Sequence, residues 1–374
     1  MKRYIFIVAA IVLATVSCSR TYDLNGGNEG QAIGFGTWAE TLTKARATGS
    51  DNTAFENGEA FDVYGFKTVA SGDKVVFNGD DVTATVSGST VTWDYSPHRF
   101  WDPAASSYTF FAALPAGQLA AEGANPYATT GLFTSSDITF DDPTAFDNDI
   151  LVGKQVVPGT GSDVPYTYSG PVDIQFNHIA SCVDLKVKQD NTLGNAEVKV
   201  TALSLVGISN VGSYTVSAYG ASSPYTPTVA WTPASGTLAE YVVLDSADAS
   251  DDVTVAGKTT YDAHAATGTT DTPADLFTGY VFMPQDLVAD TQKVKLSYTV
   301  QVGTEEPNVY TDIEIDLRDF QQTDTDNNSG TAITAWAPKT HYTYYITIGA
   351  NLITFTATVN EWATAVNGYY YLLN

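Results

Sequence analysis

The sequence predicts an all-β protein built from two tandem β-sandwich domains. Apolar and polar residues alternate along most of the chain, which is the period of a strand with one buried face. Thr, Val and Tyr favour strands and dominate these segments, and no long stretch carries the i, i+3, i+4 apolar stripe of a helix. The chain has 374 residues, 44% of them hydrophobic, which suits two domains and is too apolar for a disordered protein.

The first residues predict export. Two basic residues precede an apolar run at 5–16, which fits a secretory signal and is too short to span a bilayer as a helix. Residues 1–17 are therefore expected to be removed as a signal peptide. Cys18 at the cut is similar to the lipidated Cys of a bacterial lipobox, although Thr15 stands where Leu is usual; a plain signal peptide is the alternative. Lipidation would make outer-membrane lipid the partner of Cys18.

The net charge excludes some classes of binding partner, and the cysteine count excludes an internal disulfide. The chain carries 17 basic and 42 acidic residues. The expected signal peptide holds two of the basic residues and no acid, which leaves 15 against 42, a net charge of −27. Such a surface repels nucleic acid and anionic lipid headgroups, so no nucleic-acid partner is expected. Cys182 is the one Cys after Cys18, so no internal disulfide can form, and its strand-like surroundings predict a small core residue rather than a nucleophile or an intermolecular crosslink.

The N-terminal half begins with a predicted meander of short strands. Strand 75–77 meets Asn78-Gly79, a strong hairpin signal, and strands 82–86 and 90–93 follow. Further strands are expected at 108–114, which ends at Pro115, and at 171–176 and 183–187. The polar stretch 189–194 then interrupts two strong strands, which predicts a domain boundary near residue 190.

The second half repeats the pattern. A removable or lipidated N-terminal segment at 18–46 would precede domains at 47–190 and 191–374. One helical turn is expected at 118–122. Strands are expected at 198–206, 214–218, 241–244, 294–302, 313–317, 342–348 and 353–359, and surface loops at 159–170, 247–252 and 264–273.

Catalytic signals are weak. His98, His178, His264 and His341 stand singly in the sequence, without Cys or acid at metal-ligand spacing, so each is expected to be structural. The chain has no Gly-x-Ser-x-Gly, no His-Glu-x-x-His and no Gly-rich phosphate loop. Neither enzymatic activity nor a cofactor is expected.

One acidic stretch resembles a cation loop. Asp324, Asp326 and Asn328 place oxygen ligands at alternate positions, as Ca²⁺ requires. Gly330, however, is one position late for an EF-hand, and Ala335 stands where the bidentate Glu belongs. An acidic hairpin loop is therefore preferred over a calcium site.

Aromatic residues suggest a second class of function. Six Trp and 22 Tyr could build sugar-stacking platforms in a glycan-binding surface protein. In strand-rich chains most such rings fill the core or form cross-strand pairs. Trp93, Trp101, Trp336 and Trp362 lie in strands or at strand ends, so they are expected in the core.

Several stretches taken together resemble the fimbrillins (FimA/Mfa-like group) of Bacteroidales type V pili. Their order and spacing extend from about residue 33 to residue 362. The resemblance implies two transthyretin-like β-sandwich domains and export to the cell surface as an outer-membrane lipoprotein. The stretches are 55–64, 99–102 with 108–112 and Pro115, 174–178, 282–285, 336–338 with 342–344, and Trp362.

The resemblance also implies a mode of assembly. In polymerising fimbrillins an Arg-specific protease cuts after the first strand, and an extended segment of another pilin subunit fills the vacated groove. Here the first strand would be 31–40, with Ile33 and Phe35 on one face and Trp38 joining them only past a bulge.

The matching cleavage loop and donor segment can also be assigned. The loop 44–49 would be cut between Arg46 and Ala47, and the donor would be 366–373, with Tyr369, Tyr371 and Leu373 at alternate positions. The alternatives are an ordinary loop Arg and an ordinary last strand. The expected function is a structural or adhesive pilus subunit with a host or bacterial surface ligand as a further partner; the alternative is a surface lipoprotein that binds glycans or host ligands without polymerising.

Overall fold

The computed structural model describes an all-β molecule, as predicted. Besides the strands, the described residues form three single 3₁₀ turns, at Phe146–Asn148, Asn191–Leu193 and Leu317–Asp319. Within the described part of the chain, no helix is long and apolar enough to cross a membrane. The described residues are 31–39, 55–87, 90–117, 133–158, 171–194, 196–245, 252–255, 273–323, 330–350 and 353–362.

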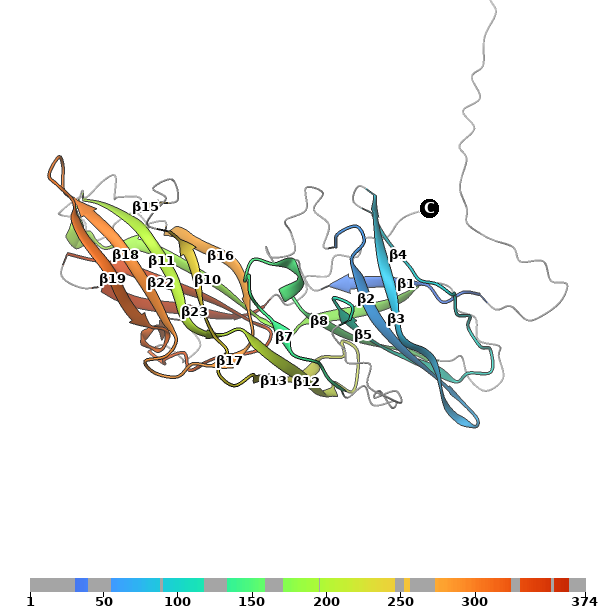
Figure 1. Cartoon of the computed structure of the whole chain (residues 1–374). Helices are drawn as coiled ribbons and strands as arrows, with labels where there is room; N and C mark the ends of the chain where they lie inside the picture. The colour runs from blue at the N-terminus through green and yellow to red at the C-terminus, as the bar shows by residue number, and fades with distance from the viewer. Residues whose placement is uncertain are drawn as a thin grey trace, which may run out of the picture.

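A seven-stranded sheet occupies one end of the molecule, drawn in blue to green in Figure 1. Its inner face surrounds the N-terminal core, a cluster that includes Phe61, Tyr108, Phe110 and Phe176. The strand order is β1 (Phe35–Ala39), β9 (Val172–His178), β8 (Leu151–Pro158), β5 (Ser107–Leu114), β2 (Ala60–Val69), β3 (Gly72–Ser87) and β4 (Thr90–Asp94).

The hairpin predicted at Asn78-Gly79 is wrong. β3 runs unbroken through both residues, and the chain reverses earlier, between Val69 and Gly72. Gly79 has φ +78° and lies where the register between β2 and β3 shifts. The left-handed backbone that Gly permits is therefore used in a β-bulge rather than in a turn.

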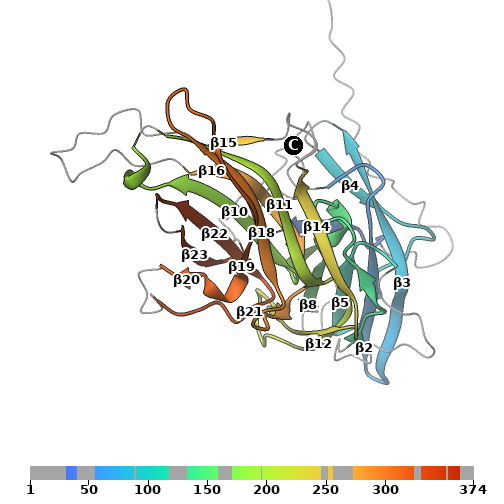
Figure 2. The same cartoon turned by 60° about the vertical axis from the view of Figure 1, so that its left-hand side comes forward.

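Two further sheets face each other across the C-terminal core, a cluster that includes Val198, Leu296, Trp336 and Tyr344. Figure 2 shows β10, β22 and β23 next to β11, β14 and β18. The first sheet has the order β16 (Ala274–Phe282), β10 (Ser181–Gln189), β22 (Thr340–Ile348), β23 (Ile353–Glu361) and β20 (Gln321–Gln322); the second has β14 (Leu238–Leu244), β11 (Glu197–Ser209), β18 (Lys293–Gln301) and β19 (Asn308–Asp316), with β15 (Val253–Val255) on β11.

A β-hairpin from the second half of the chain packs against strands from the first half. It pairs with two short strands that belong to the first half of the sequence. The junction core formed there contains Phe66 and Phe111 from the seven-stranded sheet, Tyr214 and Val216 from the hairpin, and Trp362. The hairpin is β12 (Val211–Tyr219) and β13 (Pro227–Pro233), and its partners are β6 (Phe133–Thr134) and β7 (Ile138–Thr139); β17 (Gln285–Asp286) pairs with β21 (Ala335–Trp336).

Every strand predicted from alternation has a counterpart among the described strands. The domain boundary expected near residue 190 stays a prediction. β10, which precedes it, pairs with β16 and β22 of the second half. β10 therefore belongs to a sheet made otherwise of strands from the second half.

Candidate functional site

The strand expected over 31–40 is present as β1, at the end of the seven-stranded sheet. β1 runs parallel to β9, with Phe35 opposite Val172 and Ala39 opposite Phe176. The register is continuous from Phe35 to Ala39, without a bulge. The first residue of the predicted interval to pair is Ala32, which forms a bridge with Phe100.

The chain just before β1 is held from both sides. The Ile33 N–H donates to the Arg99 carbonyl at 2.8 Å, and the Val172 N–H donates to the Gly34 carbonyl at 2.8 Å. The Tyr95 hydroxyl donates to the Ile33 carbonyl at 2.8 Å. Removing this segment would therefore leave unpaired backbone groups on two neighbouring segments.

Apolar contacts fix the side chains of this segment. Ile33 is 1% exposed and Phe35 is 6% exposed, and both belong to the N-terminal core. The Phe35 ring lies edge to face against four other rings, with centroid distances of 5.4 to 5.9 Å. Those rings belong to Phe61, Phe77, Tyr95 and Phe110. They would line an aromatic groove if β1 left.

The other predicted site residues lie outside the described residues. For them the lipidation, cleavage, donor-strand and calcium assignments stay predictions, as do the helical turn at 118–122 and the three surface loops. These residues are Cys18, Arg46, Ala47, Tyr369, Tyr371, Leu373, Asp324, Asp326 and Asn328.

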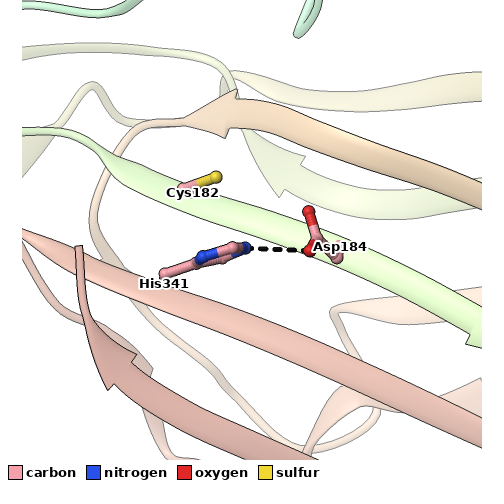
Figure 3. A group of neighbouring side chains, drawn as sticks. All are labelled: Cys182, Asp184 and His341. Atoms are coloured by element: carbon pink, nitrogen blue, oxygen red, sulfur yellow. Dashed lines mark ion pairs between the residues drawn. The ribbon is translucent and has the colours of Figure 1, made fainter. Parts of the chain in front are cut away.

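The fold brings together three side chains that the sequence analysis treated separately. Cys182 and Asp184 project from β10 and His341 from the adjacent strand β22, as Figure 3 shows. One ligand atom of each lies within 4.8 Å of the other two. Nε2 of His341 is 3.0 Å from Oδ2 of Asp184. The Gly279 N–H donates to the other carboxylate oxygen, Oδ1, at 2.7 Å.

These three residues have the composition of a Cys-His-Asp nucleophile site but not its environment. Cys182 is 1% exposed and belongs to the junction core, as expected for a small core residue. Burial and the nearby charges of Asp184 and Asp149 raise the pKa of the Cys182 thiol well above its usual range. A buried thiol that stays protonated at neutral pH is a poor nucleophile.

A second buried acid and histidine lie close by. Nδ1 of His178 is 2.6 Å from Oδ1 of Asp149, and the two side chains are 2% and 0% exposed. The indole of Trp362 stacks on the His178 ring at 4.4 Å between centroids. The stacking of Trp362 on His178 links the end of β9 to the residue that follows β23.

The four Trp expected in the core are buried or pack against it. Trp101, Trp336 and Trp362 are 5%, 1% and 2% exposed. Trp93 is partly buried and packs against Phe55 and Phe61. These rings are therefore not available as sugar-stacking platforms.

The cluster of Cys182, Asp184 and His341 could be read only in part from the sequence. Residues i and i+2 of a strand share a face, so strand period alone accounts for the proximity of Cys182 and Asp184, although the sequence analysis did not pair them. His341 is far away in sequence, and its place depends on the parallel register that sets it opposite Cys182. No local pattern encodes that register.

Comparisons with known proteins agree with this architecture. No curated protein sequence matches the chain. A fimbrial protein from Bacteroides vulgatus is 17% identical, with a TM-score of 0.53 over 89% of this chain and 99% of its own. A fimbrilin from Porphyromonas gingivalis is 11% identical, with a TM-score of 0.40 over 90% of this chain and 98% of its own. The fimbrillin-like family model matches residues 43–362, and because that match spans most of the sequence, the chain belongs to the fimbrillin-like family.

Proposed function

We propose that this protein is a structural or adhesive subunit of a cell-surface pilus, assembled by strand exchange after proteolysis. Family membership supports the pilus role and a place at the cell surface. The observation that carries the mechanism is β1: a short strand at the edge of its sheet whose Phe35 packs among four aromatic rings. In the sequence, β1 ends seven residues before Arg46. Export as an outer-membrane lipoprotein through Cys18 completes the proposal.

The groove explains why an exchanged strand would bind tightly. Burying a Phe or Ile side chain contributes about 1.5 to 3 kcal/mol each, and the unpaired backbone groups left by β1 accept any extended segment by β-augmentation. A donor that supplies two apolar residues at alternate positions would restore both contributions. The subunit without β1 is therefore poised to capture a strand from another pilin subunit.

Residues 366–373 fit the requirements of a donor. Eight extended residues span roughly 26 Å at about 3.3 Å each, which exceeds the length of the five-residue strand β1. Tyr369, Tyr371 and Leu373 alternate, so all three would face the groove. The two tyrosine rings and the Leu373 side chain would meet the same four aromatic side chains that Phe35 contacts.

An Arg-specific protease tests the proposal on the purified precursor. The chain has five Arg, at positions 3, 20, 46, 99 and 318. Arg99 is held by hydrogen bonds from its guanidinium to the carbonyls of Val76 and Pro97, so it should resist cleavage. We expect a cut between Arg46 and Ala47, found by N-terminal sequencing, followed by oligomers that resist dissociation.

Two variants separate the steps. Arg46→Ala should remain uncut at this position and monomeric, while a chain that ends after Val366 should be cut at Arg46 yet stay monomeric. A wild-type product that is cut and stays monomeric would contradict strand exchange. Oligomers formed by the truncated chain would leave cleavage standing and refute the assigned donor.

Binding of glycans or host ligands without polymerisation is the alternative function. The burial of Trp101, Trp336 and Trp362 weakens it. Tight binding on a glycan array by the uncut, monomeric protein would favour this alternative over assembly.

A further inference from the structure

We propose that Cys182, Asp184 and His341 form a binding site for one zinc ion, with three protein ligands and one open position. The site lies between two adjacent strands: β10 carries Cys182 and Asp184, and β22 carries His341, which is opposite Cys182 in the register. It is independent of strand exchange, because none of the three residues belongs to β1 or to the groove around Phe35.

The separations of the ligand atoms fit a tetrahedral ion. With Zn–N and Zn–O bonds of about 2.0 to 2.1 Å, a tetrahedral arrangement places the nitrogen and oxygen about 3.3 Å apart. Nε2 of His341 and Oδ2 of Asp184 are 3.0 Å apart. The sulfur of Cys182 lies within 4.8 Å of both, so the three ligand atoms converge on one place.

Nε2 of His341 and Oδ2 of Asp184 are 3.0 Å apart and form an ion pair when the ring is protonated. Nε2 is buried, and its direction does not meet the geometry of a hydrogen bond to any described residue. When the ring is neutral with its proton on Nδ1, the lone pair of Nε2 lies close to a carboxylate oxygen. A shared cation turns that convergence from repulsion into coordination.

The carboxylate is already oriented for this role. The Gly279 N–H holds Oδ1 of Asp184 at 2.7 Å, which leaves Oδ2 turned toward His341. Backbone donors of this kind fix ligating carboxylates in metal sites and improve affinity.

The donor set selects the metal. One thiolate, one imidazole and one carboxylate suit borderline ions such as Zn²⁺, whereas Ca²⁺ and Mg²⁺ require oxygen ligands. Cys182 is protonated in the empty site, so binding of the ion would displace the thiol proton and release it to water. The side chain of His341 is 31% exposed, while that of Asp184 is 12% exposed. The ion would therefore enter past His341, and water would take the open position.

Spectroscopy with Co²⁺ tests the site, because cobalt bound to a thiolate gives an intense near-ultraviolet charge-transfer absorption. The full chain is used with Cys18→Ser, so that Cys182 is its single thiol. We expect one equivalent of Co²⁺ to produce this absorption and Zn²⁺ to displace it. Cys182→Ser should abolish the absorption.

Two milder variants guard against misfolding. Asp184→Asn keeps an oxygen for the Gly279 N–H, and His341→Gln changes a partly exposed side chain, so thermal melting should show both folded. Each should weaken Zn²⁺ binding at least about 10-fold, measured by competition with a chelator. His98→Ala is the matched control: Nε2 of His98 lies 2.9 Å from Asp94 without a thiol, and its loss should leave the affinity unchanged.

Absence of the charge-transfer absorption with Co²⁺ would overturn the proposal. So would Zn²⁺ affinity that is the same in wild type, Asp184→Asn and His341→Gln. Neither result would touch the assembly proposal, whose readouts are cleavage and oligomer formation.

Discussion

At the scale of single residues, Asp62 is a buried carboxyl whose pKa is raised into the neutral range. It is 5% exposed on β2 and stands directly opposite Asp81 on β3. Burial raises its pKa to about 7; the Gly117 N–H opposes this shift, and the hydrogen bond and negative charge of Asp81 add to it. Asp62 therefore holds a proton in the folded chain over a range in which the unfolded chain has lost it.

This difference predicts that stability falls as pH rises from about 4 to about 7. In that interval the folded state binds more protons than the unfolded state, so the free energy of unfolding decreases with pH. Asp62→Asn, which keeps an acceptor for the Gly117 N–H, should flatten the dependence and stabilise the protein at pH 8 by on the order of 2 kcal/mol. Urea unfolding at pH 5 and pH 8 measures both effects, and an unchanged slope would contradict the assignment.

Residue identities that depend on alternation were predictable. The burial of Ile33, Phe35 and Cys182 follows from strand period and apolarity. The neighbours of Asp62 and Asp184 were not predictable, because they depend on which strands pair and in which register. A site made of side chains from two strands therefore cannot be predicted from the sequence of either strand alone.

At the scale of elements, β3 shows how one sequence signal can serve two structures. Asn-Gly permits the positive φ of a two-residue hairpin turn, but Gly79 uses that freedom in a bulge, where β2 and β3 shift register. A Cβ on Gly79 would lie 2.8 Å from the Tyr64 hydroxyl. The bulge and the ring of Tyr64 therefore fit each other.

Gly79→Ala and Gly236→Ala form a matched pair that tests this account. Both positions have nearly the same backbone angle, φ +78° and +80°, so both variants carry about 1 kcal/mol of backbone strain. At Gly236 a Cβ meets nothing within 4 Å. Gly79→Ala must in addition displace Tyr64, which should bring its total to about 2 to 3 kcal/mol. Equal losses in urea unfolding would show that Tyr64 does not constrain the bulge.

The local sequence pattern was enough to predict where the strands lie, but not to which sheet each strand belongs. β10 reads as the last strand of the first half, yet its hydrogen bonds go to β16 and β22. Likewise, β6 and β7 come from the first half and pair with β12 of the second. These assignments depend on contacts between distant segments, which alternation cannot specify.

At the scale of the whole molecule, the two halves are joined by the junction core rather than by a linker alone. β5 takes part in both packing systems: Phe110 faces the N-terminal core and Phe111 faces the junction core. Phe111 lies 5.6 Å from the Tyr219 ring of the hairpin β12–β13. Lys154 lies over both of these rings at 5.7 and 5.6 Å.

Substitutions at two adjacent positions of β5 should therefore destabilise different parts of the molecule. Phe110→Ala and Phe111→Ala each remove a fully buried ring, 0% and 1% exposed, and should each destabilise by about 3 to 5 kcal/mol. Phe110→Ala should speed amide hydrogen exchange only in the seven-stranded sheet, because its contacts end there. Phe111→Ala should also speed exchange in β12 and β13, because the hairpin loses the surface on which it packs. Unchanged exchange in the hairpin of Phe111→Ala would show that the hairpin is stable without this surface, and that the junction core does not couple the stability of the two halves.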